Sequence, residues 1–84
     1  LYSENISLDK IHWINKLKEF KNLDCLVQIR HRHKPVKCKI EVNEGFKVMF
    51  DEEIRGIAPG QSAVFYKDNL CLGGGVIEAR NNDL

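Results

Sequence analysis

Residues 61–77 constrain the fold of this chain more than any other stretch. Two apolar runs, residues 62–66 and 70–77, flank the Lys-Asp-Asn sequence at 67–69. Asp and Asn adopt left-handed backbone conformations easily and form hydrogen bonds within turns, so this pattern predicts a tight β-hairpin. Both runs carry apolar residues at odd and at even positions, which is typical of strands inside a sandwich or a closed barrel.

Three consecutive glycines, Gly73, Gly74 and Gly75, interrupt the second of these runs. Glycines inside a strand indicate a β-bulge or a sharp barrel corner at which two backbones approach closely. A phosphate-binding loop is the alternative, but no Lys-Ser/Thr pair and no helical pattern follows the glycines. We therefore expect a bulge or a corner.

Three further segments, residues 24–29, 36–42 and 46–50, alternate apolar and polar side chains. A period of two is typical of strands with one buried face, and the short connections between these segments predict antiparallel pairing. Just before the predicted hairpin of residues 62–77, Pro59 and Gly60 have the order that a type II turn requires. Proline fixes φ at the first central position of such a turn, and glycine supplies positive φ at the second.

The two ends of the chain are harder to interpret. Residues 6–8 are consistent with a short strand. Asp9 is expected to cap a short helical turn that extends to Trp13, because apolar residues recur there at a spacing of three. Residues 79–84 are polar and are expected to form a frayed tail.

The predicted fold is therefore all-β, a small closed or partly closed antiparallel β-barrel of five to seven strands with a short N-terminal helical turn. The 84 residues suffice for one domain, and 43% hydrophobic and 30% charged residues are usual for a soluble globular protein. No apolar run approaches the about 20 residues that span a bilayer, so we expect no membrane partner and a cytoplasmic location. Since the chain begins with Leu1 rather than Met, we expect a fragment of a larger protein.

Motifs of known catalytic chemistry are missing from the sequence, which has no phosphate-binding P-loop, nucleophile elbow or H-E-x-x-H pattern. His31 and His33 lack two further ligands at a spacing that zinc would need. Cys25, Cys38 and Cys71 are odd in number and lack C-x-x-C spacing, so buried packing in a reducing cytosol is favoured over a structural zinc site. We expect this chain to be non-catalytic, with no metal or cofactor of its own.

The strongest functional signal is electrostatic. Between Cys25 and Ile40 the sequence contains no acidic residue, five Lys or Arg residues and two histidines. The basic residues and histidines of this segment are Arg30, His31, Arg32, His33, Lys34, Lys37 and Lys39. Arginine matches phosphate with a planar fork, lysine acts as a point charge, and imidazole stacks on unpaired bases, so this edge is interpreted as a phosphate-binding surface. The alternative is a solvated face balanced by the acidic residues that follow between positions 41 and 53.

A second candidate is Gln61, which follows the predicted Pro-Gly turn. At the edge of a loop its amide would be available both to donate and to accept hydrogen bonds. The alternative is an ordinary polar residue at the start of a strand.

Four blocks of sequence, residues 30–36, 50–52, 58–66 and 71–77, combine into a longer pattern. The third contains Pro-Gly-Gln-Ser-Ala-Val-Phe-Tyr and the fourth reads Cys-Leu-Gly-Gly-Gly-Val-Ile. Together they resemble the C-terminal β-barrel domain of tRNA-specific 2-thiouridylases, from about Leu1 to Glu78. The resemblance implies that residues 1–84 are a single C-terminal domain of a larger enzyme, whose ATP-pyrophosphatase and central domains lie outside this chain.

The resemblance also implies a function for the parent enzyme, which would use ATP with magnesium to adenylate the wobble uridine (U34) of tRNA. It would then transfer persulfide sulfur, supplied by a sulfur-carrier protein, to carbon 2 of that base. The family's catalytic cysteines belong to the N-terminal domain, so the three cysteines here do not correspond to them. The barrel would grip the tRNA through the matching positions Arg30, His31, Arg32 and Gln61, whereas His33 stands where the family often has Gln. Two alternatives remain: a free-standing RNA-binding barrel of the translation-factor type, and an interdomain docking module.

Overall fold

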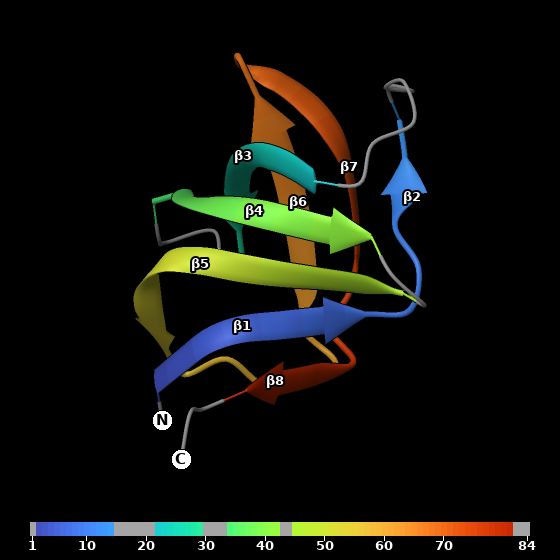
Figure 1. Ribbon diagram of the computed structural model, residues 1–84. Coiled ribbons are helices and arrows are strands. Elements are labelled where there is room, and N and C mark those ends of the chain that lie inside the picture. Colours follow the sequence, from blue (N-terminus) through green and yellow to red (C-terminus); the bar gives the residue numbers. More distant parts are fainter. Residues whose placement is uncertain (1, 15–21, 30–33, 43–44, 82–84) are drawn as a thin grey trace.

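The chain folds into one antiparallel sheet that coils around a single core (Figure 1). The computed structural model describes residues 2–14, 22–29, 34–42 and 45–81. Its strands are β1 (Tyr2–Leu8), β2 (His12–Trp13), β3 (Asn22–Gln28), β4 (Val36–Val42), β5 (Phe46–Arg55), β6 (Ser62–Lys67), β7 (Leu70–Val76) and β8 (Ala79–Asn81). They lie in the order β2-β7-β6-β3-β4-β5-β1-β8. The predicted all-β antiparallel barrel is confirmed, but the described residues form eight strands rather than the predicted five to seven, and the shortest are β2 and β8.

The segment that joins β1 to β2 runs between two strands that lie far apart in the order of the sheet. These strands follow each other in sequence, yet β1 pairs with β5 and β8 while β2 pairs with β7 near the opposite edge of the sheet (Figure 1). A side chain at Gly75 of β7 would overlap the carbonyl oxygen of Lys10 and come within 2.8 Å of the Leu8 side chain. The connection therefore lies directly against β7 and brings the two edges of the sheet close together.

The core is formed by the inward faces of the strands and by side chains from the connections. Its buried members are Ile6, Leu8, Ile11, Cys25, Val27, Cys38, Ile40, Val48, Ile57, Ala63, Phe65, Leu72 and Ile77. Alternation on β3, on most of β4 and on the first half of β5 places Cys25, Cys38 and Val48 inside, as predicted. Val42 at the end of β4 departs from this pattern and is 41% exposed. On β6 the inner residues Ala63 and Phe65 are fully buried, whereas the outer face is only half-buried.

The β6–β7 hairpin has the tight turn that the sequence predicts. Lys67 pairs with Leu70, and the two residues between them, Asp68 and Asn69, have φ angles of 52° and 66°. Positive φ at both central positions defines the type I′ turn, whose twist matches that of the flanking strands. Asp and Asn tolerate this conformation better than other residues with side chains.

The glycine run marks a bulge and a close approach between backbones, as expected. The register of β6 against β7 shifts between Phe65 and Tyr66, which leaves one extra residue on β7. Gly73 follows this shift with φ of 150°, and a side chain there would overlap the carbonyl oxygen of His12 and lie 2.9 Å from the Cα of Trp13. Only glycine lets β2 approach β7 at this distance.

The predicted helical turn from Asp9 to Trp13 was wrong. The end of this segment is strand β2, which pairs with Gly73 and Gly74 of β7. Ile14, one of the residues whose spacing suggested the turn, is 65% exposed. The β7 backbone satisfies the hydrogen-bonding groups of β2, and this long-range pairing outweighs the local spacing of apolar residues.

The predicted tail was also wrong for its first residues. Strand β8 pairs with β1, with Ala79 opposite Ser7 and Asn81 opposite Asn5. The Glu78 N–H donates to the Ser7 carbonyl oxygen at 2.8 Å and fixes the start of this pairing. Residues 82–84 lie outside the described part of the chain.

Candidate nucleic-acid interface

The β3–β4 hairpin carries the basic segment. The predicted contact residues Arg30, His31 and Arg32 lie outside the described residues. Lys34 and Lys37 are described, and both are exposed. The structure thus places two of the five basic contacts predicted on this hairpin, one just before β4 and one within it.

Strand register aligns Lys37 with an apolar and aromatic row on the outer face of the sheet. Lys37 of β4 lies opposite Leu26 of β3, and Leu26 lies opposite Tyr66 of β6. Leu26 and Tyr66 are half-buried. Lys37 and the Tyr66 ring thus lie in one row with Leu26 between them, and a cation and an aromatic ring on one surface can contact both the phosphates and the bases of an unpaired strand. Tyr66 was not predicted as a site residue, because its place in the row depends on which strands are neighbours.

Lys39, two residues further along β4, has different surroundings. It lies opposite Asp24 of β3 and Met49 of β5. The Nζ of Lys67 also reaches this point and donates to the Asp24 carbonyl oxygen at 3.2 Å. Opposite charges that face each other across antiparallel strands attract, so the Asp24 carboxylate offsets the charge of Lys39. Lys37 therefore has the more favourable surroundings for a phosphate on its β3 side.

Gln61 closes the Pro-Gly turn with both its backbone and its side chain. Gly60 has φ of 94°, and the Gln61 N–H donates to the Ala58 carbonyl oxygen at 3.3 Å, as in a type II turn. The Ala58 N–H in turn donates to Gln61 Oε1 at 2.9 Å. Since this acceptor has to be the amide oxygen, the side chain presents its NH₂ group, a donor, away from the turn. Oε1 keeps a second lone pair, so Gln61 can still both donate to and accept from a ligand, and its NH₂ group is the part of the amide that this turn contact does not use.

Gln61 lies at the end of the sheet from which the basic connection leaves. In the β3–β6 pair, Gln28 at the end of β3 is opposite Val64, three residues after Gln61. In the β3–β4 pair, Val27 is opposite Val36, the first residue of β4. The end of β3, the start of β4 and the start of β6 therefore share one end of the sheet, called here the hairpin end, with Lys34, Lys37 and Gln61.

Lys34 faces a more mixed environment than Lys37. It lines a groove of about 520 Å³ together with Glu52, Glu53 and Arg55 of β5. Two carboxylates near one edge of the hairpin reduce the local positive potential. Balance by the chain's own acids, the alternative raised for the whole segment, therefore applies to Lys34.

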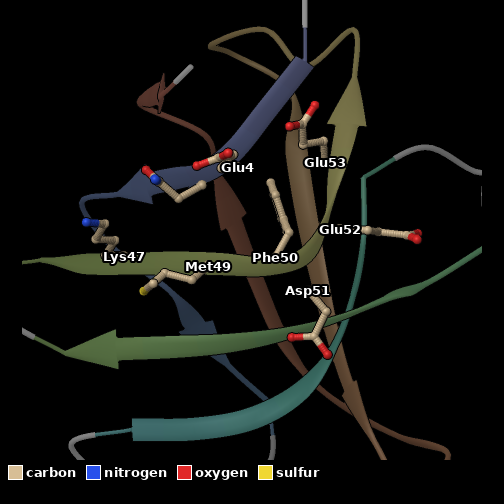
Figure 2. A pocket seen from close by; sticks show the side chains of 8 residues that line it. Glu4, Lys47, Met49, Phe50, Asp51, Glu52 and Glu53 are labelled. Carbon is tan, nitrogen blue, oxygen red and sulfur yellow. The ribbon is translucent and has the colours of Figure 1, made fainter. Parts of the chain in front are cut away.

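A second groove, of about 350 Å³, is strongly acidic (Figure 2). Its lining comes from β1 and β5 and includes four carboxylate residues and a single lysine (Figure 2). The carboxylate residues are Glu4, Asp51, Glu52 and Glu53, and the lysine is Lys47. A concave surface of this charge repels a phosphate backbone. Three consecutive acids of β5, Asp51, Glu52 and Glu53, thus contribute to an acidic surface, whereas the basic segment belongs to the β3–β4 hairpin.

Two further properties bear on the predicted chemistry. In the described ranges, no group of three or more His, Cys, Asp or Glu side chains is placed to hold a metal ion. Those ranges also contain no helix long and apolar enough to cross a membrane.

Comparison with known protein families agrees with the β-barrel domain that the sequence resembles. A family model described as the aminomethyltransferase beta-barrel domain matches residues 3–77. The chain belongs to this family. The match covers every strand of the barrel from β2 to β7, including the β3–β4 hairpin and the glycine run of β7.

Curated relatives of this barrel domain carry a common name, tRNA-specific 2-thiouridylase MnmA. The Idiomarina loihiensis protein is 40% identical over 85 residues, which is 99% of this chain and 23% of the relative. The Vibrio parahaemolyticus protein is 43% identical over 82 residues (95% and 22%), and the Histophilus somni protein is 45% identical over 80 residues (93% and 21%). The chain spans about a fifth of the length of these relatives. The resemblance to tRNA-specific 2-thiouridylases is confirmed.

Proposed function

We propose that this barrel is the tRNA-binding C-terminal domain of an enzyme that 2-thiolates the wobble uridine (U34) of tRNA. The parent enzyme would use ATP with magnesium and receive its sulfur from a persulfide-carrying protein. Adenylation and sulfur transfer belong to domains outside residues 1–84. The relatives named tRNA-specific 2-thiouridylase support the reaction, and the surface of the barrel supports the role of this domain.

The observation that carries the binding role is the coincidence of two features at the hairpin end. One is a segment with no acidic residue between Cys25 and Ile40, which includes the exposed Lys37. The other is Gln61, whose oxygen is held by the Ala58 N–H so that its NH₂ group is the part offered to a ligand. Cations position a sugar-phosphate backbone, and an oriented amide donor adds a contact of defined direction.

The charge distribution gives the bound tRNA an orientation. Phosphates approach the β3–β4 hairpin and avoid the acidic groove between β1 and β5. The row of Lys37, Leu26 and Tyr66 extends the basic surface toward β6 and offers an aromatic ring to an unpaired base. Few phosphate contacts are available on so small a surface, so the isolated chain binds tRNA weakly and with a shallow dependence on salt concentration.

The test is a double substitution, Arg30→Ala with Arg32→Ala, in the full-length enzyme. Loss of two phosphate contacts lowers tRNA affinity and reduces the slope of log K against log salt concentration by about 2. The matched control is Lys47→Ala in the acidic groove, which leaves both quantities unchanged. Unchanged tRNA affinity in the double variant, combined with weaker association between the barrel and the other domains, would favour the docking alternative instead.

A further inference from the structure

Two buried thiols lie against each other across the β3–β4 pair. Cys25 of β3 is the direct register partner of Cys38 of β4, and their Sγ atoms are 3.7 Å apart. Both are reduced, and only 8% of Cys25 and 3% of Cys38 is exposed. The proposed tRNA-binding role makes no use of this pair.

The backbone geometry of the pair already suits a disulfide. Residues directly opposite each other on antiparallel strands have Cα atoms about 4.5 to 5.5 Å apart, and disulfides span Cα separations of about 4.4 to 6.8 Å. Both side chains point to the same, inner side of the sheet. Bringing the sulfurs of Cys25 and Cys38 to a bonding distance of about 2.05 Å therefore requires side-chain rotation rather than movement of the strands.

The two thiols differ in acidity. The hydrogen bond from Cys38 lowers the pKa of Cys25, against the opposing effect of burial and with help from the charge of Lys67. The same hydrogen bond, together with burial, raises the pKa of Cys38 far above its ordinary value. Because the thiolate is the nucleophilic form, Cys25 is the residue that reacts first, and Cys38 keeps its proton for the second step.

We propose that Cys25 and Cys38 are a redox-active pair that forms a reversible intramolecular disulfide when the protein meets hydrogen peroxide. The Cys25 thiolate attacks one peroxide oxygen, the O–O bond breaks, and a sulfenic acid and hydroxide are formed. The Cys38 sulfur then attacks the sulfenic sulfur, the S–S bond forms, and the departing hydroxide takes the Cys38 proton to give water. Each sulfur loses one electron, and the two electrons reduce peroxide to two waters. A dithiol reverses the reaction by exchange.

The position of the pair gives the disulfide a structural effect. The crosslink closes a ring of residues 25–38, which contains the whole connection between β3 and β4. Closing such a loop lowers the entropy of the unfolded chain, and the native register lets the folded state accept the bond. Oxidation therefore stabilises the hairpin that carries the basic segment.

The experiment uses the 84-residue chain treated with hydrogen peroxide at pH 8, then unfolded and alkylated, with mass measured on the intact protein. We expect untreated protein to alkylate at all three cysteines and oxidised protein at Cys71 alone, with a Cys25–Cys38 peptide found after digestion. The oxidised protein melts about 10 °C higher. Dithiothreitol restores alkylation at Cys25 and Cys38.

Control variants distinguish a specific Cys25–Cys38 disulfide from unspecific oxidation of single thiols. Cys25→Ala and Cys38→Ala leave the remaining member of the pair open to alkylation, whereas Cys71→Ala still forms the crosslink. The mass measurement on the alkylated wild-type protein requires no variant, so a variant that fails to fold does not affect the test. Three alkylated cysteines after peroxide, a crosslink to Cys71, or a disulfide that lowers the melting temperature would each overturn the proposal.

Discussion

Two hairpins of the barrel, β6–β7 and β3–β4, depend on their residues for different reasons. In β6–β7, backbone geometry decides: Asp68 and Asn69 occupy left-handed positions, and Gly73 lies where a side chain would overlap β2. In β3–β4, the inner face belongs to the core, while the outer face and the connection carry charge, as at Lys37. Substitutions in the first hairpin should therefore cost stability, and outward-facing substitutions in the second should cost binding.

Gly73→Ala should have the largest effect on stability. The new Cβ overlaps the His12 carbonyl oxygen and forces a φ of 150° on a residue with a side chain. We expect the free energy of unfolding to fall by about 3 kcal/mol or more, measured by urea denaturation. Gly60→Ala is the matched control, because Gly60 also has positive φ but no atom within 4 Å of the added Cβ. Strain alone should cost about 1 to 2 kcal/mol there, and equal losses in the two variants would contradict the close approach of β2 to β7.

Lys37→Glu should have the opposite effects, with little change in stability and a clear loss of tRNA affinity. Reversing an exposed charge beside the apolar Leu26 leaves the core intact, so the melting temperature should change little. The affinity for tRNA should fall about tenfold at moderate salt, as measured by fluorescence anisotropy. Lys39→Glu serves as the comparison, since Asp24 already offsets that lysine, and its effect should be smaller. Equal losses in both variants would show that the contact is with the general charge of β4 rather than with the hairpin end.

Gln61 lies between these two cases, because its oxygen serves the fold and its NH₂ group is assigned to the ligand. Gln61→Ala removes the acceptor for the Ala58 N–H and should cost about 1 kcal/mol of unfolding free energy. Gln61→Glu keeps a carboxylate oxygen at that place and should retain most of the stability. Both variants lose the amide donors, so both should bind tRNA less tightly. Wild-type binding by a stable Gln61→Glu variant would limit this residue to its role in the turn.

Local patterns were enough to predict most of the barrel. The alternation on β3, β4 and β5 is visible because each strand has one buried face, and the Asp-Asn turn is visible because few residues tolerate its backbone. Strands β2 and β8 were missed, since two or three residues show no periodicity and owe their form to distant partners. Those partners are Gly73 and Gly74 for β2 and the residues of β1 for β8.

The candidate site was predictable in composition but not in detail. An acid-free basic segment is a property of the sequence, so Lys37 was found directly. Its difference from Lys39 arises from register, which places Leu26 opposite one lysine and Asp24 opposite the other. The Gln61 contact with the Ala58 N–H depends on the folded turn, and the Cys25–Cys38 contact depends on the alignment of two strands. Neither of these two contacts can be predicted from the spacing of residues along the sequence.

The most direct test of the account is to find where tRNA contacts the barrel. Backbone amide chemical shifts of the isotope-labelled chain, followed by NMR during titration with tRNA, report each position separately. We predict saturable shifts at the hairpin end, including Lys34, Lys37 and Gln61, whereas Glu4 and Lys47, which line the acidic groove but not the groove of Lys34, stay unaffected. Shifts centred on the acidic groove, or a hairpin end that stays unchanged while tRNA binds elsewhere, would contradict it.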